Sequence, residues 1–152
     1  MSSKQMKWAV AAIAAAAIMA LIFFFSAQPV QDSDSLSKGI SRKLLEWFPV
    51  LHEKVTLSEL NHYLRKLAHF TIYFALGVCL TVAAGRQKKL PPVVVSILIG
   101  TVFAASDEIH QIFSDGRGPM VRDVVLDACG VAAGSALAAA GGKLARKMRR
   151  NS

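Results

Sequence analysis

The sequence predicts an all-α integral membrane protein, a bundle of four transmembrane helices with a short external amphipathic helix. Of its 152 residues, 53% are hydrophobic and only 18% are charged. The apolar residues gather in blocks of about 18 to 20, the length needed to cross a hydrocarbon core of about 30 Å. Basic residues flank these blocks, and no stretch resembles a soluble domain. We therefore expect one membrane domain over residues 1–152.

The first apolar block is interpreted as a retained membrane anchor. The four spans are expected at about residues 8–25, 67–84, 93–113 and 123–140, with an external loop at 26–66. A cleaved signal peptide is the alternative for the first block. The core of such a peptide is usually about 7 to 15 residues, shorter than this block, and Phe25 fits a cleavage site poorly. These two observations favour the anchor.

Glycine and proline mark the ends of the other spans. Gly85 ends the second span, and Pro91 and Pro92 lie near the start of the third, where proline is favoured. The segment Ser114–Arg122 contains two glycines and a proline, so an external turn is predicted there. Gly141 and Gly142 are expected to break the fourth span.

Small residues inside the spans predict packing rather than chemistry. Gly130 and Gly134 are four residues apart, the small-x-x-x-small spacing that lets membrane helices approach closely. Cys79 and Cys129 both lie within apolar spans and are interpreted as small hydrophobic residues. Neither a disulfide nor a metal thiolate site is expected from them.

The external loop contains the pattern of a short amphipathic helix. Apolar residues recur at helical spacing at Leu36, Ile40, Leu44, Leu45 and Phe48. This helix is expected either to lie at the membrane interface, with Trp47 at head-group depth, or to pack against the bundle. Further on, Thr56 and Glu59 fit a capping box that starts a helix continuing into the second span.

The basic residues predict the orientation of the chain. They lie before the first span (Lys4, Lys7), between the second and third (Arg86, Lys88, Lys89) and after the fourth (Lys143, Arg146, Lys147, Arg149, Arg150). By the positive-inside rule these three regions, and so both termini, are cytoplasmic in a multi-pass cell-membrane protein. Because the basic residues flank spans, we expect membrane lipids rather than nucleic acid as their partners.

Nearly every polar residue within the spans falls at the opposite end. These residues are Ser26 and Gln28, then Lys66, His69 and Tyr73, then Asp107, Glu108 and Gln111, then Asp123 and Asp127. Successive spans run antiparallel, so the end of one and the start of the next lie on the same side. Hydrocarbon penalises such side chains, so they are expected to face one another around a polar site.

The second span presents three of these residues on one face. Lys66, His69 and Tyr73 are spaced i, i+3 and i+7. Each has an ordinary structural interpretation as well, since a lysine can extend to the membrane interface and a histidine can hydrogen-bond a neighbouring helix. This face indicates a functional site only in combination with the acidic residues of the other spans.

Four carboxylates lie on the third and fourth spans. Asp107 and Glu108 are adjacent near the end of an apolar helix, where they are costly unless paired, protonated or solvated. Gln111 follows one turn after Asp107 on the same face. Asp123 and Asp127 are also one turn apart. Their spacing directs them along a single face of the fourth span.

Arg117 and Arg122 lie between the acidic pairs and are the natural counter-charges. A structural ion network that ties the helix ends together is one interpretation. The number of charged groups favours another, in which the cluster binds a phosphate or sugar head group, relays a proton or holds a divalent cation. No cofactor is predicted, since metal-binding pairs, a phosphate-binding glycine loop and a nucleophile elbow are all missing from the sequence.

Three ordered motifs resemble the VanZ-like family of bacterial membrane proteins. FSAQPVQDSDSLS (Phe25–Ser37) is similar to that family's serine-glutamine-proline segment, and RKLAHFTIYFALG (Arg65–Gly77) to its Lys-x-x-His-Phe-x-x-Tyr pattern. SDEIHQIFSDGRGPMVRDVVLDACGVAAG (Ser106–Gly134) resembles its acidic, arginine and Asp-x-x-x-(Asn/Asp)-x-x-Gly blocks. One departure is Asp127, where many members carry asparagine, and it adds a carboxylate to the site.

The resemblance implies a small protein of the bacterial plasma membrane, with lowered sensitivity to glycopeptide antibiotics such as teicoplanin as the associated phenotype. We expect an outward-facing site that binds a lipid-linked cell-wall intermediate or, less directly, a glycopeptide. The residues expected to bind are Lys66, His69, Tyr73, Asp107, Glu108, Gln111, Arg117, Asp123 and Asp127.

Two alternatives remain open from the sequence. The first is a membrane enzyme acting on a lipid-linked substrate, with Glu108 or Asp107 as general base and His69 as acid or base. The second is a structural membrane subunit whose polar cluster only locks the packing of the helices.

Overall fold

The protein is helical throughout the parts of the chain that the computed structural model describes, residues 2–27, 30–52, 54–87, 89–115 and 120–151. The elements are α1 (Ser3–Ser26), α2 (Val30–Trp47), α3 (Pro49–His52), α4 (Leu57–Ala84), α5 (Pro92–Asp115) and α6 (Val121–Arg150). Of these, α1, α4, α5 and α6 are long and apolar enough to cross a membrane. The predicted all-α architecture with four membrane-spanning helices is confirmed.

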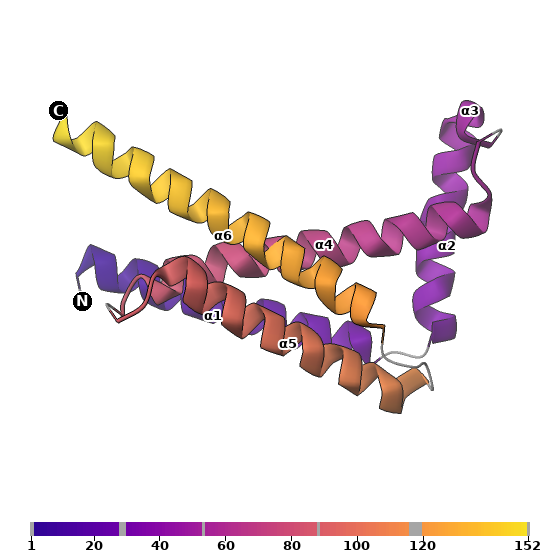
Figure 1. Ribbon diagram of the computed structural model, residues 1–152. Helices are drawn as coiled ribbons and strands as arrows, with labels where there is room; N and C mark the ends of the chain where they lie inside the picture. Colours follow the sequence, from indigo (N-terminus) through magenta and orange to yellow (C-terminus); the bar gives the residue numbers. More distant parts are fainter. Residues whose placement is uncertain (1, 28–29, 53, 88, 116–119, 152) are drawn as a thin grey trace.

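The four long helices form a bundle in which successive helices run in opposite directions (Figure 1). Both termini therefore lie at one end of the bundle. The last turns of α1 and α5 lie at the other end, together with the first turns of α4 and α6. Helix α4 is central, since it packs against α1, α2, α5 and α6. This arrangement is what brings the polar ends of four helices to one place.

The start of α4 is fixed by the predicted capping box. The Thr56 hydroxyl accepts a hydrogen bond from the Glu59 backbone N–H, and the Glu59 carboxylate accepts one from the Thr56 N–H at 2.9 Å. Two of the amides that a helix N-terminus leaves unpaired are thereby satisfied. The helix then continues without a break to Ala84, with Gly85 as its C-cap, as the sequence predicts.

Close packing of α4 against α6 depends on glycine. A Cβ at Gly130 would lie 2.7 Å from the carbonyl oxygen of Phe70, and a Cβ at Gly134 would overlap the carbonyl of Phe74. The backbones of the two helices approach directly at these positions because no side chain separates them. The predicted packing role of the glycine pair is confirmed.

Helix α5 joins this contact through Val131 and two serines. Val131 is fully buried, and it packs against both Gly77 of α4 and Gly100 of α5. Beside it, the Ser96 hydroxyl donates to the Gly77 carbonyl at 3.1 Å and lies 2.8 Å from the Ser135 hydroxyl. Three helices are thus held in register by one buried valine and one buried hydrogen-bonded group.

The hydrophobic core lies between α1, α4, α5 and α6. Its buried members are Ala15, Ile22, Tyr73, Leu76, Leu80, Phe103, Ala104 and Val131. Many other large apolar side chains face outward, as expected for helices that lipid surrounds. The core occupies the middle of the bundle and forms the floor beneath the polar end.

The structure corrects several expected boundaries. Gly141 and Gly142 do not break α6, which continues to Arg150; each glycine costs a helix only about 1 kcal/mol relative to alanine. The segment 26–66, expected as an external loop that contains an amphipathic helix and the start of the next helix, contains α2, α3 and the first turns of α4. The turn expected at Ser114–Arg122 is shorter, because α5 ends at Asp115 and α6 begins at Val121.

Helix α2 contains most of the amphipathic pattern, for which the sequence leaves two interpretations open. It packs across the first turns of α4, with Ser41 and Leu45 buried in the contact (Figure 1). Trp47 is 73% exposed at its C-terminal end. Helix α2 therefore packs against the bundle through its buried face, as the second interpretation predicts.

Candidate functional site

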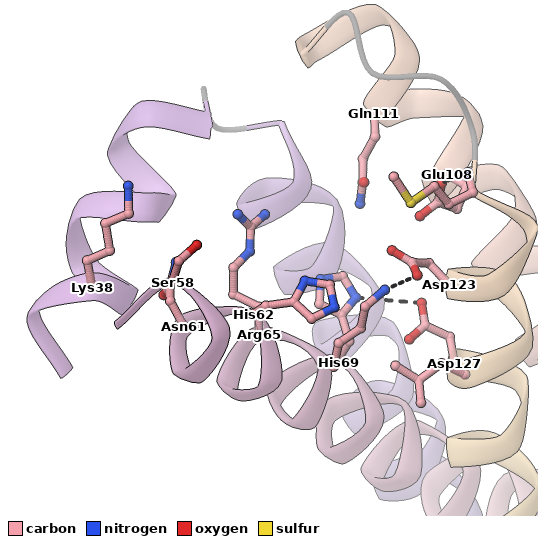
Figure 2. Close-up of a pocket in the computed structure, with 13 residues that line it drawn as sticks. Lys38, Ser58, Asn61, His62, Arg65, His69, Glu108, Gln111, Asp123 and Asp127 are labelled. Atoms are coloured by element: carbon pink, nitrogen blue, oxygen red, sulfur yellow. Dashed lines mark hydrogen bonds and ion pairs between the residues drawn. The ribbon is translucent and has the colours of Figure 1, made fainter. Parts of the chain in front are cut away.

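A polar pocket of about 450 Å³ lies where α2, α4, α5 and α6 meet, at the end opposite the termini (Figure 2). Its walls are formed by Lys38, Ser58, Asn61, His62, Arg65, Lys66, His69, Glu108, Gln111, Met120, Asp123, Leu126 and Asp127. Pockets that hold small molecules are typically about 300 to 1,000 Å³. The size is therefore that of a binding site rather than of a packing defect.

The charges of the pocket are divided between two walls. The wall built by α2 and α4 carries the basic groups, Lys38, Arg65 and Lys66, together with two histidines. The wall built by α5 and α6 carries the carboxylates, Glu108, Asp123 and Asp127. Figure 2 shows Lys38 and Arg65 on one side of the pocket and the carboxylates on the other. A ligand with an anionic group at one end and hydroxyl or amino groups at the other would complement both walls.

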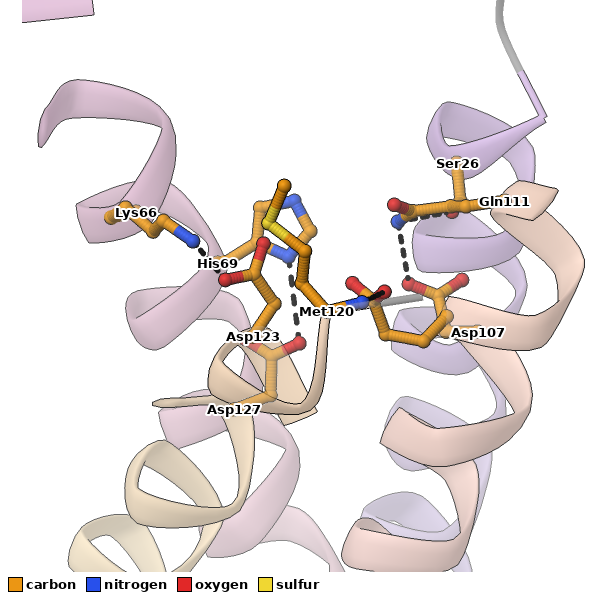
Figure 3. A network of polar contacts seen from close by, with 9 residues as sticks. Ser26, Lys66, His69, Asp107, Gln111, Met120, Asp123 and Asp127 are labelled. Carbon is orange, nitrogen blue, oxygen red and sulfur yellow. Dashed lines mark hydrogen bonds and ion pairs between the residues drawn. The ribbon is translucent and has the colours of Figure 1, made fainter. Parts of the chain in front are cut away.

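An ion pair and a histidine–carboxylate contact join the walls at their base (Figure 3). Lys66 of α4 pairs with Asp123 of α6, and both side chains are partly exposed. One turn deeper, Nδ1 of His69 lies 3.6 Å from Oδ2 of Asp127. The Asp127 side chain is only 3% exposed, whereas that of His69 is 39% exposed. The predicted faces of α4 and α6 therefore do meet, and His69 connects a buried carboxylate to the open pocket.

Glu108 caps the N-terminus of α6. Its Oε2 accepts a hydrogen bond from the backbone N–H of Met120 at 3.0 Å, and Met120 is the N-cap residue of α6. No side chain of α6 itself caps this end. A carboxylate at a helix N-terminus is stabilised by the unpaired amides and by the helix dipole. Glu108 thus links the end of α5 to the start of α6.

Gln111 extends the polar contacts to α1. Its Nε2 donates to the Ser26 hydroxyl at 2.8 Å and to Oδ2 of Asp107 at 3.4 Å (Figure 3). Asp107 is only 1% exposed and lies one helical turn below Gln111. All four long helices therefore contribute a polar group to this end of the bundle.

Three buried oxygens around the floor of the pocket have no hydrogen-bond partner among the described residues. They are the hydroxyl of Tyr73, Oδ1 of Asp107 and Oδ1 of Asp127. Buried polar atoms are nearly always hydrogen-bonded, and leaving one unpaired costs about 1 to 3 kcal/mol. Within the described residues, these three oxygens are therefore left without hydrogen-bond partners.

The structure brings together most of the predicted binding residues. Those that line the pocket are Lys66, His69, Glu108, Gln111, Asp123 and Asp127. Tyr73 and Asp107 lie below it, in the core, rather than in its walls. Arg122 is exposed and does not line the pocket. Arg117 and Gln28 lie outside the described residues.

Sequence reasoning missed the polar first turns of α4. Ser58, Asn61, His62 and Arg65 line the pocket together with His69. Their spacing of three or four residues places them on one helical face, which extends the predicted face toward the capping box. Lys38, from α2, could not be found in this way because its place depends on how α2 crosses α4.

Metal binding is not supported by a preformed cluster in the described part of the chain. No three histidine, cysteine, aspartate or glutamate side chains are grouped there so as to hold a metal ion. The carboxylates of the pocket are instead engaged one by one, by Lys66, by His69 and by the Met120 amide. A divalent cation stays a prediction from the sequence.

Comparison with known proteins identifies the family. A family model described as VanZ/LLP1 matches residues 11–142, most of the chain. Comparisons with curated proteins and with solved structures gave no match. The match includes all of α4 and α5, most of α1 and α6, and every residue that lines the pocket. The chain therefore belongs to the VanZ/LLP1 family, and its four apolar helices make it a VanZ-like membrane protein.

Proposed function

We propose that this protein binds the head group of a lipid-linked or cell-wall intermediate at the outer face of the bacterial cell membrane, and thereby lowers susceptibility to glycopeptides of the teicoplanin type. The observation that carries the proposal is the polar pocket, with a basic wall opposite an acidic wall and, at its floor, buried oxygens that have no hydrogen-bond partner among the described residues. Such an arrangement suits a ligand that carries both a phosphate and a sugar.

The two walls have distinct chemical roles in this proposal. Arg65 and Lys38 would engage a phosphate or carboxylate, because guanidinium and ammonium groups form charge-assisted hydrogen bonds with such anions. Asp127, whose second oxygen has no partner among the described residues, would accept a hydrogen bond from a hydroxyl or amino group. Glu108 and Asp123 would contribute to the same wall.

The distribution of basic residues supports an outward-facing pocket. The opposite end of the bundle carries the lysines and arginines that precede α1, lie between α4 and α5 and end α6. Basic residues in short loops and near helix ends favour the cytoplasmic side. Both termini would then be cytoplasmic, and the pocket would open toward the cell wall.

The test compares Glu108→Gln with Glu46→Gln, the same change at an exposed position of α2 that does not line the pocket. In cells that express each variant at equal level, the Glu108 change is expected to lower the teicoplanin concentration needed to stop growth. The Glu46 control is expected to behave as wild type. Removal of the pocket histidine by His69→Ala is expected to act as the Glu108 change does.

Two results would contradict the proposal. If the variants lose the folded protein in detergent, the cluster is needed for helix packing and the structural alternative applies. If purified protein converts a lipid-linked phosphate substrate, and Glu108→Gln removes that turnover, the enzymatic alternative replaces simple binding.

A further inference from the structure

A second hollow adjoins the polar pocket and differs from it in chemistry. This apolar groove, of about 770 Å³, runs between α1, α2 and α4. Most of its lining is aliphatic or aromatic, for example Ile22, Phe25, Ile40, Leu67 and Ile72. The groove lies on the side of α4 that faces α1, away from the carboxylates of α6.

The apolar groove and the polar pocket share three residues. Arg65, His69 and Gln111 line both. The two hollows are therefore continuous at one turn of α4, where Arg65 and His69 stand. At this junction Arg65 offers a guanidinium, and the carboxylates of Asp123 and Asp127 lie across the polar pocket from it (Figure 2).

We propose that the occupant of both hollows is a single amphiphile, a long-chain phosphate ester that carries a sugar. Its hydrocarbon chain lies in the apolar groove, its phosphate lies at the junction beside Arg65, and its sugar lies against the acidic wall. This proposal rests on the proposed function and adds to it the place of the chain and the order of the three chemical parts.

Charge and size distinguish this occupant from an ordinary phospholipid. The order of surfaces along the path is apolar, then basic, then acidic, which matches a chain, a phosphate and a group of hydroxyl or amino donors. The acidic wall carries three carboxylates, and the whole polar pocket has a volume of about 450 Å³. One ethanolamine group would use a single carboxylate and a small part of that volume, whereas a sugar uses several acceptors.

The binding test uses the full chain in phosphatidylcholine nanodiscs and three probes. Glucosamine 1-phosphate carries the head alone, dodecyl phosphate carries the chain and phosphate, and the dodecyl phosphodiester of glucosamine carries all three parts. We expect the complete probe to bind at least about tenfold more tightly than either part, a factor equivalent to about 1.4 kcal/mol.

Two matched variants locate the chain. Ala68→Trp fills the apolar groove, and Ala133→Trp makes the same change at an exposed position of α6 that lines neither hollow. The Ala68 change is expected to weaken the complete probe about tenfold and to leave glucosamine 1-phosphate within about twofold. The Ala133 control is expected to change neither. Arg65→Gln is expected to weaken all three probes, since each contains the phosphate.

The outcomes separate this inference from the proposed function. If the Ala68→Trp and Ala133→Trp variants bind the complete probe equally well, and both still bind glucosamine 1-phosphate, the hydrocarbon chain does not lie in the apolar groove. Head-group binding would then remain in place. Displacement of the complete probe by phosphatidylethanolamine at equal concentration would show that a common phospholipid is the occupant and would also overturn it. Failure of all three probes to bind would overturn the proposed function itself.

Discussion

At the scale of single residues, Asp127 is a buried carboxylate at the edge of the polar pocket, inside an otherwise apolar bundle. One of its oxygens faces His69 at 3.6 Å, and the other is buried without a hydrogen-bond partner in the part of the chain that the structure describes. A buried carboxylate is expensive unless it is compensated. Its pairing with a partly exposed histidine keeps this group within reach of the pocket.

The pairing of His69 with Asp127 predicts a measurable coupling. In a double-mutant cycle of His69→Ala and Asp127→Ala, the interaction in the free energy of unfolding is expected to be about 0.5 to 3 kcal/mol. Unfolding is measured in detergent by circular dichroism. The control cycle combines His62→Ala with Asp127→Ala, since His62 lines the same pocket. The effects of these two substitutions on the free energy of unfolding should add within about 0.5 kcal/mol. Additivity in both cycles would show that the pair contributes nothing.

At the scale of elements, contact between α4 and α6 depends on missing side chains. Gly134→Ala is expected to destabilise the bundle by about 1 to 3 kcal/mol, because the added methyl group overlaps the Phe74 carbonyl and the helices must separate. Gly141→Ala is the control on the same helix, since nothing lies within 4 Å of a Cβ there. It should leave stability unchanged or raise it by up to about 1 kcal/mol. Thermal unfolding of both variants in one detergent gives the comparison.

The contact between α5 and the other two helices predicts a smaller effect. Ser96→Ala removes the buried hydrogen bonds to Gly77 and Ser135, and hydrogen bonds between membrane helices average about 0.6 kcal/mol. Thr71→Ala removes an exposed hydroxyl that, among the described residues, donates to the Leu67 carbonyl of its own helix. A loss of stability is expected for Ser96→Ala and not for Thr71→Ala. The reverse order would show that the buried serines do not hold α5 in register.

At the scale of the whole molecule, the antiparallel order of the helices assigns the polar pocket and the termini to opposite ends (Figure 1). This predicts opposite accessibility for two lysines. In a chain without Cys79 and Cys129, Lys54→Cys should react with an impermeant maleimide on intact cells. Lys89→Cys, between α4 and α5, should react only after the membrane is opened. Labelling of the second variant on intact cells would invert the topology and place the pocket in the cytoplasm.

Much of this architecture was predictable from the sequence. The length of the apolar blocks specifies four helical spans, because a chain segment that crosses hydrocarbon must satisfy its own backbone hydrogen bonds. The capping box of Thr56 and Glu59 specifies where α4 begins. Glycines at 130 and 134 specify a face of close approach. The break expected at Gly141 and Gly142 was wrong, because local composition is a weak guide to where a helix ends.

The sequence by itself determined that polar groups from four spans gather at one end, because antiparallel crossing leaves no other arrangement. Only the tertiary structure decided which of them face one another. The pairing of Lys66 with Asp123, the position of Asp107 and Tyr73 below the pocket, and the junction at Arg65 all depend on how far the helices rotate and cross. Periodicity gives the face of each helix, whereas the depth and angle of contact come from glycine packing between α4 and α6, which no single helix encodes.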